Sequence, residues 1–138
     1  MSGRGETPNS KLKIPAHPDA GAIARRAVSR WMRGDPRLED SLLAVTELVN
    51  NAVLHGGLGE DEDLTVEMRA SDGGVRLTVR HTGGPFDVDE PARWSRDPEA
   101  SRGLAIIEQI ADRWGIDSDG GEVTAWFEVG RRLGRDRG

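Results

Sequence analysis

The sequence predicts a single α+β domain, a two-layer sandwich in which helices cover one face of a mostly antiparallel, mixed sheet. Two patterns predict this class: apolar residues recur at helical spacing in three stretches, and apolar and polar residues alternate in others, as in strands with one wet face. A length of 138 residues suits one domain. We expect this domain to span residues 11–130, with flexible segments at 1–10 and 131–138.

The chain begins with a short edge strand and a helix. The segment Lys11–Pro15 reads as the strand, because two prolines, Pro15 and Pro18, stop it. A helix from about Asp19 to Arg33 follows, with small and apolar residues on one face and Gly34 as its stop.

A long second helix is predicted next. Asp35 is a good N-cap, and Pro36 suits the first helical position, where its missing N–H leaves no donor unpaired. Gly56-Gly57 ends the run. One apolar stripe at helical spacing contains Leu38, Leu42, Val45, Val49, Ala52 and Val53.

The second half of the chain alternates strands, a loop and a helix. Residues 64–68 and 75–79 alternate as the two strands of a hairpin, and Ser71-Asp72-Gly73-Gly74 forms its turn. Gly83–Ser101 has little periodicity and reads as a long functional loop. Ser101 caps a third predicted helix, whose apolar face runs from Leu104 to Trp114. A last strand covers residues 123–129.

The most informative feature is a pair of polar residues in the long helix. Glu47 and Asn51 lie one helical turn apart, nearly opposite the apolar stripe at about 100° per residue. Leu43 and Leu54 share their face, so the helix is apolar almost all round. Such a helix is either covered on both sides or lines a pocket. The alternative is that Glu47 and Asn51 are surface residues or serve packing.

If the helix lines a pocket, Glu47 and Asn51 are suited to phosphate chemistry. The carboxamide oxygen of Asn51 is a suitable ligand for Mg²⁺. The carboxylate of Glu47 suits a general base that accepts a proton from a hydroxyl attacking a phosphate. This chemistry requires a phosphate site elsewhere in the chain.

Two Gly-containing segments supply candidates for that site. His81-Thr82-Gly83-Gly84 closes a strand, and Ser101-Arg102-Gly103-Leu104 opens a helix. Glycine near a helix N-terminus lets a phosphate approach backbone N–H groups, where the helix dipole favours negative charge.

Composition excludes several other classes. The absence of cysteine excludes disulfides and thiolate metal sites, and the formal net charge of -5 argues against nonspecific nucleic-acid binding. No segment approaches the roughly 20 apolar residues of a membrane span. We therefore expect a soluble cytoplasmic protein that binds neither nucleic acid nor membrane.

The order of these motifs resembles the Bergerat-fold ATP-binding superfamily. The resemblance rests on Glu-Leu-Val-Asn-Asn-Ala, a strand ending in Thr-Gly-Gly, a long loop, Arg-Gly-Leu opening a helix, and Gly-Gly-Glu-Val-Thr-Ala-Trp-Phe-Glu. It covers about residues 11–129. Within the superfamily, the chain looks like the small anti-sigma-factor serine kinases of the stand-alone actinobacterial type.

The resemblance implies roles for individual residues. It implies that Glu47 is the general base and that Asn51 binds Mg²⁺. The loop 84–101 would be the ATP lid. Gly83 would lie below the adenine, Gly103 would face the phosphates, and the hydroxyl of Thr124 would help to read the adenine edge. The remaining nucleotide-binding positions are His81, Ser101, Arg102 and Leu104.

The resemblance also implies partner switching. A homodimer would hold a sigma factor, or phosphorylate a serine on an antagonist protein of the STAS-domain type. Two positions depart from the family pattern: His81 replaces an Asp that accepts a hydrogen bond from the adenine amino group, and Ser101 replaces a Gly. Two functions therefore stay open. One is an ATP-dependent protein serine kinase, and the other is a nucleotide-independent protein-binding module of the same fold.

Overall fold

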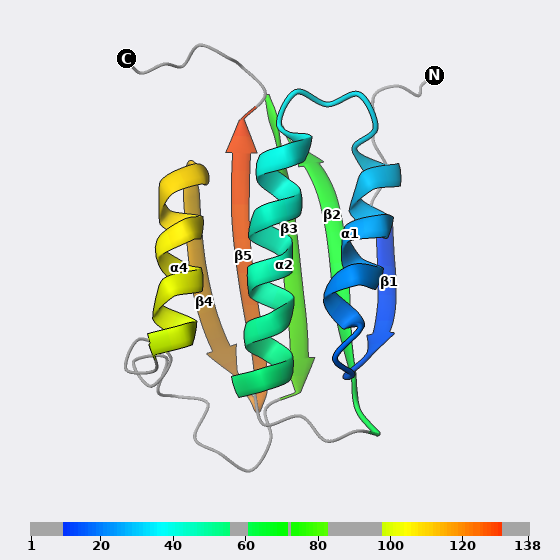
Figure 1. The fold of residues 1–138 in the computed structure, drawn as a ribbon, viewed down its shortest axis with the longest axis vertical. Helices are drawn as coiled ribbons and strands as arrows, with labels where there is room; N and C mark the ends of the chain where they lie inside the picture. The colour runs from blue at the N-terminus through cyan, green and yellow to red at the C-terminus, as the bar shows by residue number, and fades with distance from the viewer. Residues whose placement is uncertain (1–9, 56–60, 72, 83–97, 131–138) are drawn as a thin grey trace.

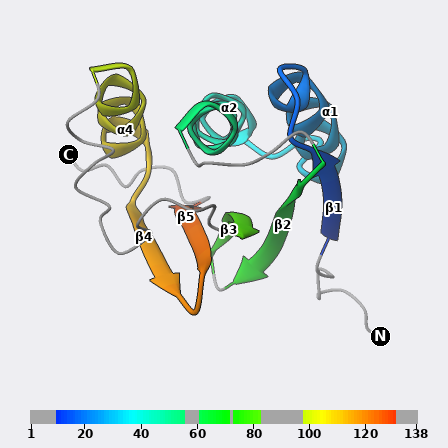
Figure 2. The same ribbon diagram turned by 90° about the horizontal axis from the view of Figure 1, so that it is seen from below.

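In the described part of the chain, three helices lie side by side on one face of a five-stranded sheet, and no described element covers the other face (Figures 1 and 2). The computed structural model describes residues 10–55, 61–71, 73–82 and 98–130. The elements in chain order are β1 (Ser10–Pro15), α1 (Ala20–Trp31), α2 (Leu38–His55), β2 (Asp63–Ser71), β3 (Gly74–Thr82), α4 (Pro98–Ile110), β4 (Arg113–Asp119) and β5 (Glu122–Gly130). The predicted α+β two-layer sandwich is confirmed.

The strand order is β1-β2-β3-β5-β4, and each of these pairings is antiparallel. The described sheet is therefore antiparallel throughout, and not mixed as predicted. Alternation along each strand sends apolar side chains to the helices and polar ones to the open face. The core residues of the sheet include Val66, Leu77, Val79 and Phe127.

Helix α2 is the central helix, with α1 on one side and α4 on the other (Figure 2). Its buried apolar residues include Val45, Leu48 and Val49. Leu43 and Leu54 are exposed, at 43% and 63%. The sequence predicted a helix that is either covered on both sides or lines a pocket. Helices α1 and α4 cover the two flanks of α2, while Leu43 and Leu54 lie on its exposed surface.

The predicted start of α2 needs a small correction. The helix begins at Leu38 and not at Pro36, but Asp35 acts as predicted, because its Oδ1 accepts a hydrogen bond from the Arg37 N–H at 2.8 Å. Helix α1 ends at Trp31, two residues earlier than expected. Gly34 has a φ of 82°, which suits a residue that stops a helix.

Strand β4 was not predicted. The sequence analysis placed Trp114 on the third helix, but α4 ends at Ile110 and Trp114 lies in β4. Trp114 follows Ile107 and Ile110 at spacings that fit a helix, and it also alternates with Ile116 as in a strand, so its periodicity alone was ambiguous. Gly120 and Gly121, with φ of 63° and 85°, join β4 to β5 in a two-residue hairpin turn.

The start of α4 was also placed too late. The helix begins at Pro98, so Ser101 is inside the helix and is not its cap. Proline suits this first position because it has no N–H to leave unpaired. The predicted lid 84–101 therefore loses its last four residues to α4. Its other residues lie outside the described part of the chain, as do Gly56-Gly57 and the terminal segments 1–9 and 131–138.

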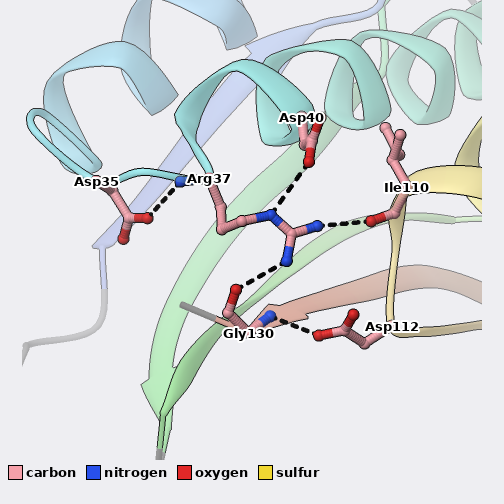
Figure 3. Close-up of polar contacts among 6 residues, drawn as sticks. All are labelled: Asp35, Arg37, Asp40, Ile110, Asp112 and Gly130. Carbon is pink, nitrogen blue, oxygen red and sulfur yellow. Dashed lines mark hydrogen bonds and ion pairs between the residues drawn. The ribbon is translucent and has the colours of Figure 1, made fainter. Parts of the chain in front are cut away.

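One arginine links three elements at the end of the molecule where α2 begins (Figure 3). The guanidinium of Arg37 donates to the carbonyls of Ile110 and Gly130, at 2.7 and 2.8 Å, and to the Asp40 carboxylate at 3.1 Å. The last carbonyl of α4 and the last residue of β5 are thereby tied to the start of α2. Asp112 accepts from the Gly130 N–H at 2.6 Å and extends this connection to the loop before β4.

We expect Arg37→Met to lower the free energy of unfolding by about 2 kcal/mol, because it removes the charge-assisted hydrogen bonds to the carbonyls of Ile110 and Gly130. Urea denaturation measures this change. Arg25→Met, on the exposed surface of α1, is the control and should change stability by less than about 0.5 kcal/mol. Equal effects in the two variants would contradict a special role for Arg37.

Candidate nucleotide site

The predicted pair of polar residues lies where α2 faces α4. Asn51 is only 4% exposed and Glu47 is half-buried. Gly103 of α4 packs directly on them: a Cβ at this glycine would lie 2.7 Å from Glu47 Oε1 and 3.6 Å from Asn51 Nδ2. The structure thus brings together three predicted site residues from two helices, and the surface interpretation does not hold for Asn51.

The side chain of Asn51 is polar, buried and incompletely paired. Its Nδ2 has no hydrogen-bond partner among the described residues. Leaving a buried amide unpaired typically costs about 1–3 kcal/mol, so a natural protein retains one for a reason. A carboxamide offers an acceptor oxygen as well as a donor, and rotation about its last bond presents either one.

His81 occupies the end of β3 on the face that carries the helices. It is 4% exposed, and its direct neighbours on β2 and β5 are Leu64 and Val123. Its Nδ1 lies 3.1 Å from the carbonyl oxygen of Thr82. Because a carbonyl can only accept, Nδ1 carries the proton in this contact. His81 Nε2 is buried and has no partner within the described part of the chain.

Burial lowers the pKa of His81 from its ordinary value, while the hydrogen bond to Thr82 and the negative charges of Glu62 and Glu122 oppose this shift. The neutral imidazole is therefore favoured in the folded protein. In that form Nε2 carries a lone pair and is an acceptor.

This pKa shift predicts how stability depends on pH. Below about pH 6.5 an unfolded His81 binds a proton that the folded protein resists, so stability falls as pH drops through this value, by up to about 1.4 kcal/mol per pH unit. Chemical denaturation of the wild type and of His81→Gln between pH 8 and 5.5 measures it. The wild type should lose stability relative to the variant on acidification. Parallel curves would show that His81 titrates normally.

Thr124 lies on the opposite face of the sheet from His81. It pairs with Arg80 and Asp117, on the open face, whereas His81 pairs with Val123 on the face that carries the helices. The open face is polar there: Arg80 forms an ion pair with Glu67 at 2.9 Å. The predicted role of Thr124 at the adenine edge therefore does not fit its position.

Val123, which the sequence placed in the last strand but not at the site, is the β5 residue that lies beside His81. It is buried beside His81, and Leu104 of α4 packs against it together with Ile116. The signal was present in the sequence, because Val123 alternates with Ala125 and Phe127, and only one of two adjacent strand residues faces the helices. Leu104 thus lies against the strand neighbour of His81.

The other predicted positions contribute less to the described site. Arg102 is exposed on the first half of α4, and its charge is accessible there. Ser101 lies in α4, with its side chain outside the described residues, and Gly83 lies wholly outside them.

The residues fit a magnesium nucleotide. Gly103 keeps side-chain atoms away from Glu47 and Asn51, Asn51 offers a buried carboxamide, and Nε2 of His81 offers an acceptor. Among the described residues no group of three or more Asp, Glu or His side chains could hold a metal ion. Proteins commonly bind Mg²⁺ through one or two side chains and the phosphates of a substrate, and the Asn51 carboxamide could supply one such ligand.

The sequence matches the family described as the histidine kinase-like ATPase domain over residues 14–127. The chain belongs to this family. Curated relatives are the serine-protein kinases RsbW of Listeria monocytogenes, 31% identical over 73% of this chain and 74% of the relative, and of Bacillus pumilus, 26% identical over 92% and 87%. The chain therefore falls among relatives of RsbW within the histidine kinase-like ATPase family.

Solved structures agree on the fold. A structure of the RsbU and RsbW domains of Rv1364c from Mycobacterium tuberculosis matches with a TM-score of 0.69 and 24% identity, over 91% of this chain. This chain spans 33% of that longer protein. The catalytic domain of histidine kinase ThkA matches with a TM-score of 0.55 and 14% identity, over 88% of this chain and 96% of that domain. Within the described residues, no helix is both long and apolar enough to cross a membrane.

Proposed function

We propose that this chain is an ATP-dependent protein serine kinase that regulates a sigma factor by partner switching. In this proposal a homodimer binds the sigma factor, and phosphorylation of a serine on a STAS-domain antagonist controls which partner it holds. The relatives named serine-protein kinase RsbW support the class of activity. The proposal for this chain rests on one observation: Gly103 of α4 packs directly against Glu47 and Asn51 of α2.

Glu47 is the proposed catalytic residue. Its carboxylate is half-buried between α2 and α4, where it is held beside Asn51 and Gly103. It would accept the proton of the substrate serine hydroxyl as that oxygen attacks phosphorus. Magnesium-bound ATP, when present, supplies the phosphoryl group.

The remaining residues hold the nucleotide in this proposal. Asn51 contributes the protein ligand to Mg²⁺, and the absence of a side chain at Gly103 lets phosphates approach the backbone of α4. Arg102 and Ser101 act at the phosphates, while Leu104, His81 and Gly83 contact the nucleoside. Thr124 is left out, because it faces the other side of the sheet from His81.

A transfer assay tests the activity. The purified protein is incubated with γ-labelled ATP and a STAS-domain protein from the same genome, with magnesium or with a chelator. We expect magnesium-dependent label on one serine of the STAS protein, and no label when that serine is replaced by alanine. Absence of transfer to every STAS-domain protein of that genome would contradict the proposal.

We expect Gly103→Ala to lower ATP affinity without lowering the stability of the fold. The new Cβ would come too close only to the flexible end of Glu47, at 2.7 Å, whereas Glu47 Cβ and Asn51 Nδ2 would lie at ordinary contact distances of 3.5 and 3.6 Å. Alanine is also a better helix former by about 1 kcal/mol, so the fold should be retained. ATP affinity should fall by roughly tenfold or more, because the methyl group displaces the Glu47 carboxylate and crowds the phosphate approach. Thermal unfolding and calorimetry measure the two effects.

The control for this variant is Ala105→Ser, at an exposed position of the same helix. It should leave ATP affinity unchanged. If Gly103→Ala also binds ATP with wild-type affinity, the phosphates do not approach α4 at this glycine.

A second candidate function is a nucleotide-independent protein-binding module. The close packing of Gly103 on Glu47 and of Leu104 on Val123 favours it, because α4 packs directly on α2 and on β5 in this structure. A pull-down of the cognate sigma factor distinguishes the two functions. An unchanged yield with ATP, magnesium or chelator supports the module, whereas strict dependence on nucleotide contradicts it.

A further inference from the structure

Helices α2 and α4 face each other along one stripe of residues on each helix. The stripe on α2 recurs at spacings of three and four residues, as positions on one side of a helix do. The two helices run in opposite directions, so the start of α2 lies beside the end of α4 (Figure 1). The stripe begins one residue before α2, because the carbonyl of Arg37 already accepts the Ser41 N–H at 3.0 Å, as in a helix. The α2 stripe is Arg37, Asp40, Ala44, Glu47 and Asn51, and its counterpart on α4 is Gly103, Ile107 and Ile110.

The two ends of this stripe are held by different kinds of contact. At the nucleotide end, Gly103 packs against Glu47. In the middle, Ala44 and Ile107 are both 0% exposed. At the opposite end, the guanidinium of Arg37 donates to the last carbonyl of α4 at 2.7 Å (Figure 3). A directional polar contact at one end of α4 therefore restrains the helix that forms one wall of the site.

Arg37 restrains the end of α4 in more than one direction. Its guanidinium reaches acceptors on three elements at once, because its N–H donors form a rigid planar fork. These acceptors are the Asp40 carboxylate at 3.1 Å, the Ile110 carbonyl and the Gly130 carbonyl at 2.8 Å. The Arg37 side chain is 15% exposed, and charge-assisted hydrogen bonds are stronger in such a partly dry place than on the surface. The end of α4 is thus fixed relative to both α2 and the sheet.

We propose that Arg37 is a positioning residue for phosphoryl transfer. Through Ile110 it sets the separation of α2 and α4 at the place where Gly103 faces the carboxylate of Glu47. Gly103 lies seven positions before Ile110, about 10 Å along the helix, so a tilt of about 6° at the end of α4 would move Gly103 by about 1 Å. Misplacement of this size slows an enzyme by roughly tenfold or more. This inference rests on the proposed kinase function and adds a residue outside the site on which the transfer rate depends.

Phosphoryl transfer in folded variants tests this role. Single-turnover transfer to the STAS-domain substrate is measured at saturating magnesium ATP for the wild type and Arg37→Met, at a temperature where circular dichroism shows both to be fully folded. We expect the transfer rate of Arg37→Met to fall roughly tenfold, and its dissociation constant for ATP to rise by no more than about threefold, because Asn51 and the nucleoside contacts remain. A residue that only stabilised the fold would leave both quantities unchanged in the folded protein.

Two further variants complete the test. Arg76→Met makes the same change on the open face of the sheet, where Arg76 pairs with Glu128 at 3.0 Å, and it should transfer phosphate at the wild-type rate. Arg37→Lys keeps the charge but has one nitrogen in place of the fork, so its transfer rate should fall by about threefold. Arg37→Lys also replaces Arg37→Met in the test if the methionine variant does not fold.

Three outcomes overturn the proposal, and they differ in what else they affect. A wild-type transfer rate in folded Arg37→Met, or in folded Arg37→Lys if the methionine variant does not fold, shows that Arg37 only stabilises the fold. An equal loss of rate in Arg76→Met shows that the effect does not depend on α4. Both results leave the proposed kinase function intact. No transfer by the wild type would instead contradict the proposed function together with this inference.

Discussion

Replacement of Glu47 by glutamine is expected to lower the rate of phosphoryl transfer by roughly 10²–10⁴-fold, the usual contribution of a general base. Glutamine has nearly the same shape, so it keeps the contact with Gly103 but cannot accept the proton of a serine hydroxyl. ATP affinity should stay within about threefold of the wild type, because the base acts in the transition state. Single-turnover transfer to the STAS-domain substrate measures the rate, and calorimetry measures the affinity.

The matched control is Glu39→Gln, an exposed change of the same kind in the first turn of α2. It should leave both quantities unchanged. If folded Glu47→Gln transfers phosphate at the wild-type rate, Glu47 is not the general base and its burial beside Asn51 needs another explanation.

The second large effect is expected for Asn51→Ala. Removal of the carboxamide should lower magnesium-dependent ATP affinity by roughly 100-fold, the equivalent of about 3 kcal/mol, because a ligand to a charged group is lost in a buried site. The free energy of unfolding should stay the same or rise, since the change also removes a buried amide nitrogen without a partner. Loss of binding in a variant at least as stable as the wild type would identify a residue kept for function.

Asn50→Ala is the control for this variant. Asn50 lies on the opposite flank of α2, where its Oδ1 would be 3.0 Å from a Cβ at Gly21 of α1. ATP affinity should be unchanged in Asn50→Ala. A similar loss of affinity in both variants would indicate general damage to α2.

The sequence predicted the fold class because its periodic patterns are strong. The alternation in residues 64–68 and 75–79 corresponds to β2 and β3, and Asp35 caps the start of α2 as its position indicated. Strand β4 was missed because Trp114 fits helical and strand spacing equally well. The helix and strand assignments of Trp114 are distinguished only by its pairing with Phe127 on β5, which depends on the tertiary fold.

The candidate site was predictable to a similar degree. Glu47 and Asn51 were recognisable because polar groups in an apolar helix are costly to bury. Their contact with Gly103, more than fifty positions along the chain, needed the packing of α4 on α2. The assignment of Thr124 failed for a local reason, because a shift of one residue along a strand changes the face of the sheet. The free nitrogen of His81 depends on a contact with the neighbouring Thr82 carbonyl that no spacing pattern reveals.

We propose that α2, α4 and the end of β3 form a working site for magnesium-bound ATP. Calorimetric titration of the wild-type protein with ATP, in the presence and absence of magnesium, tests it most directly. We expect saturable binding that requires magnesium and is lost in Asn51→Ala. Absence of binding up to millimolar ATP would contradict it, and the protein would then be a nucleotide-independent interaction module.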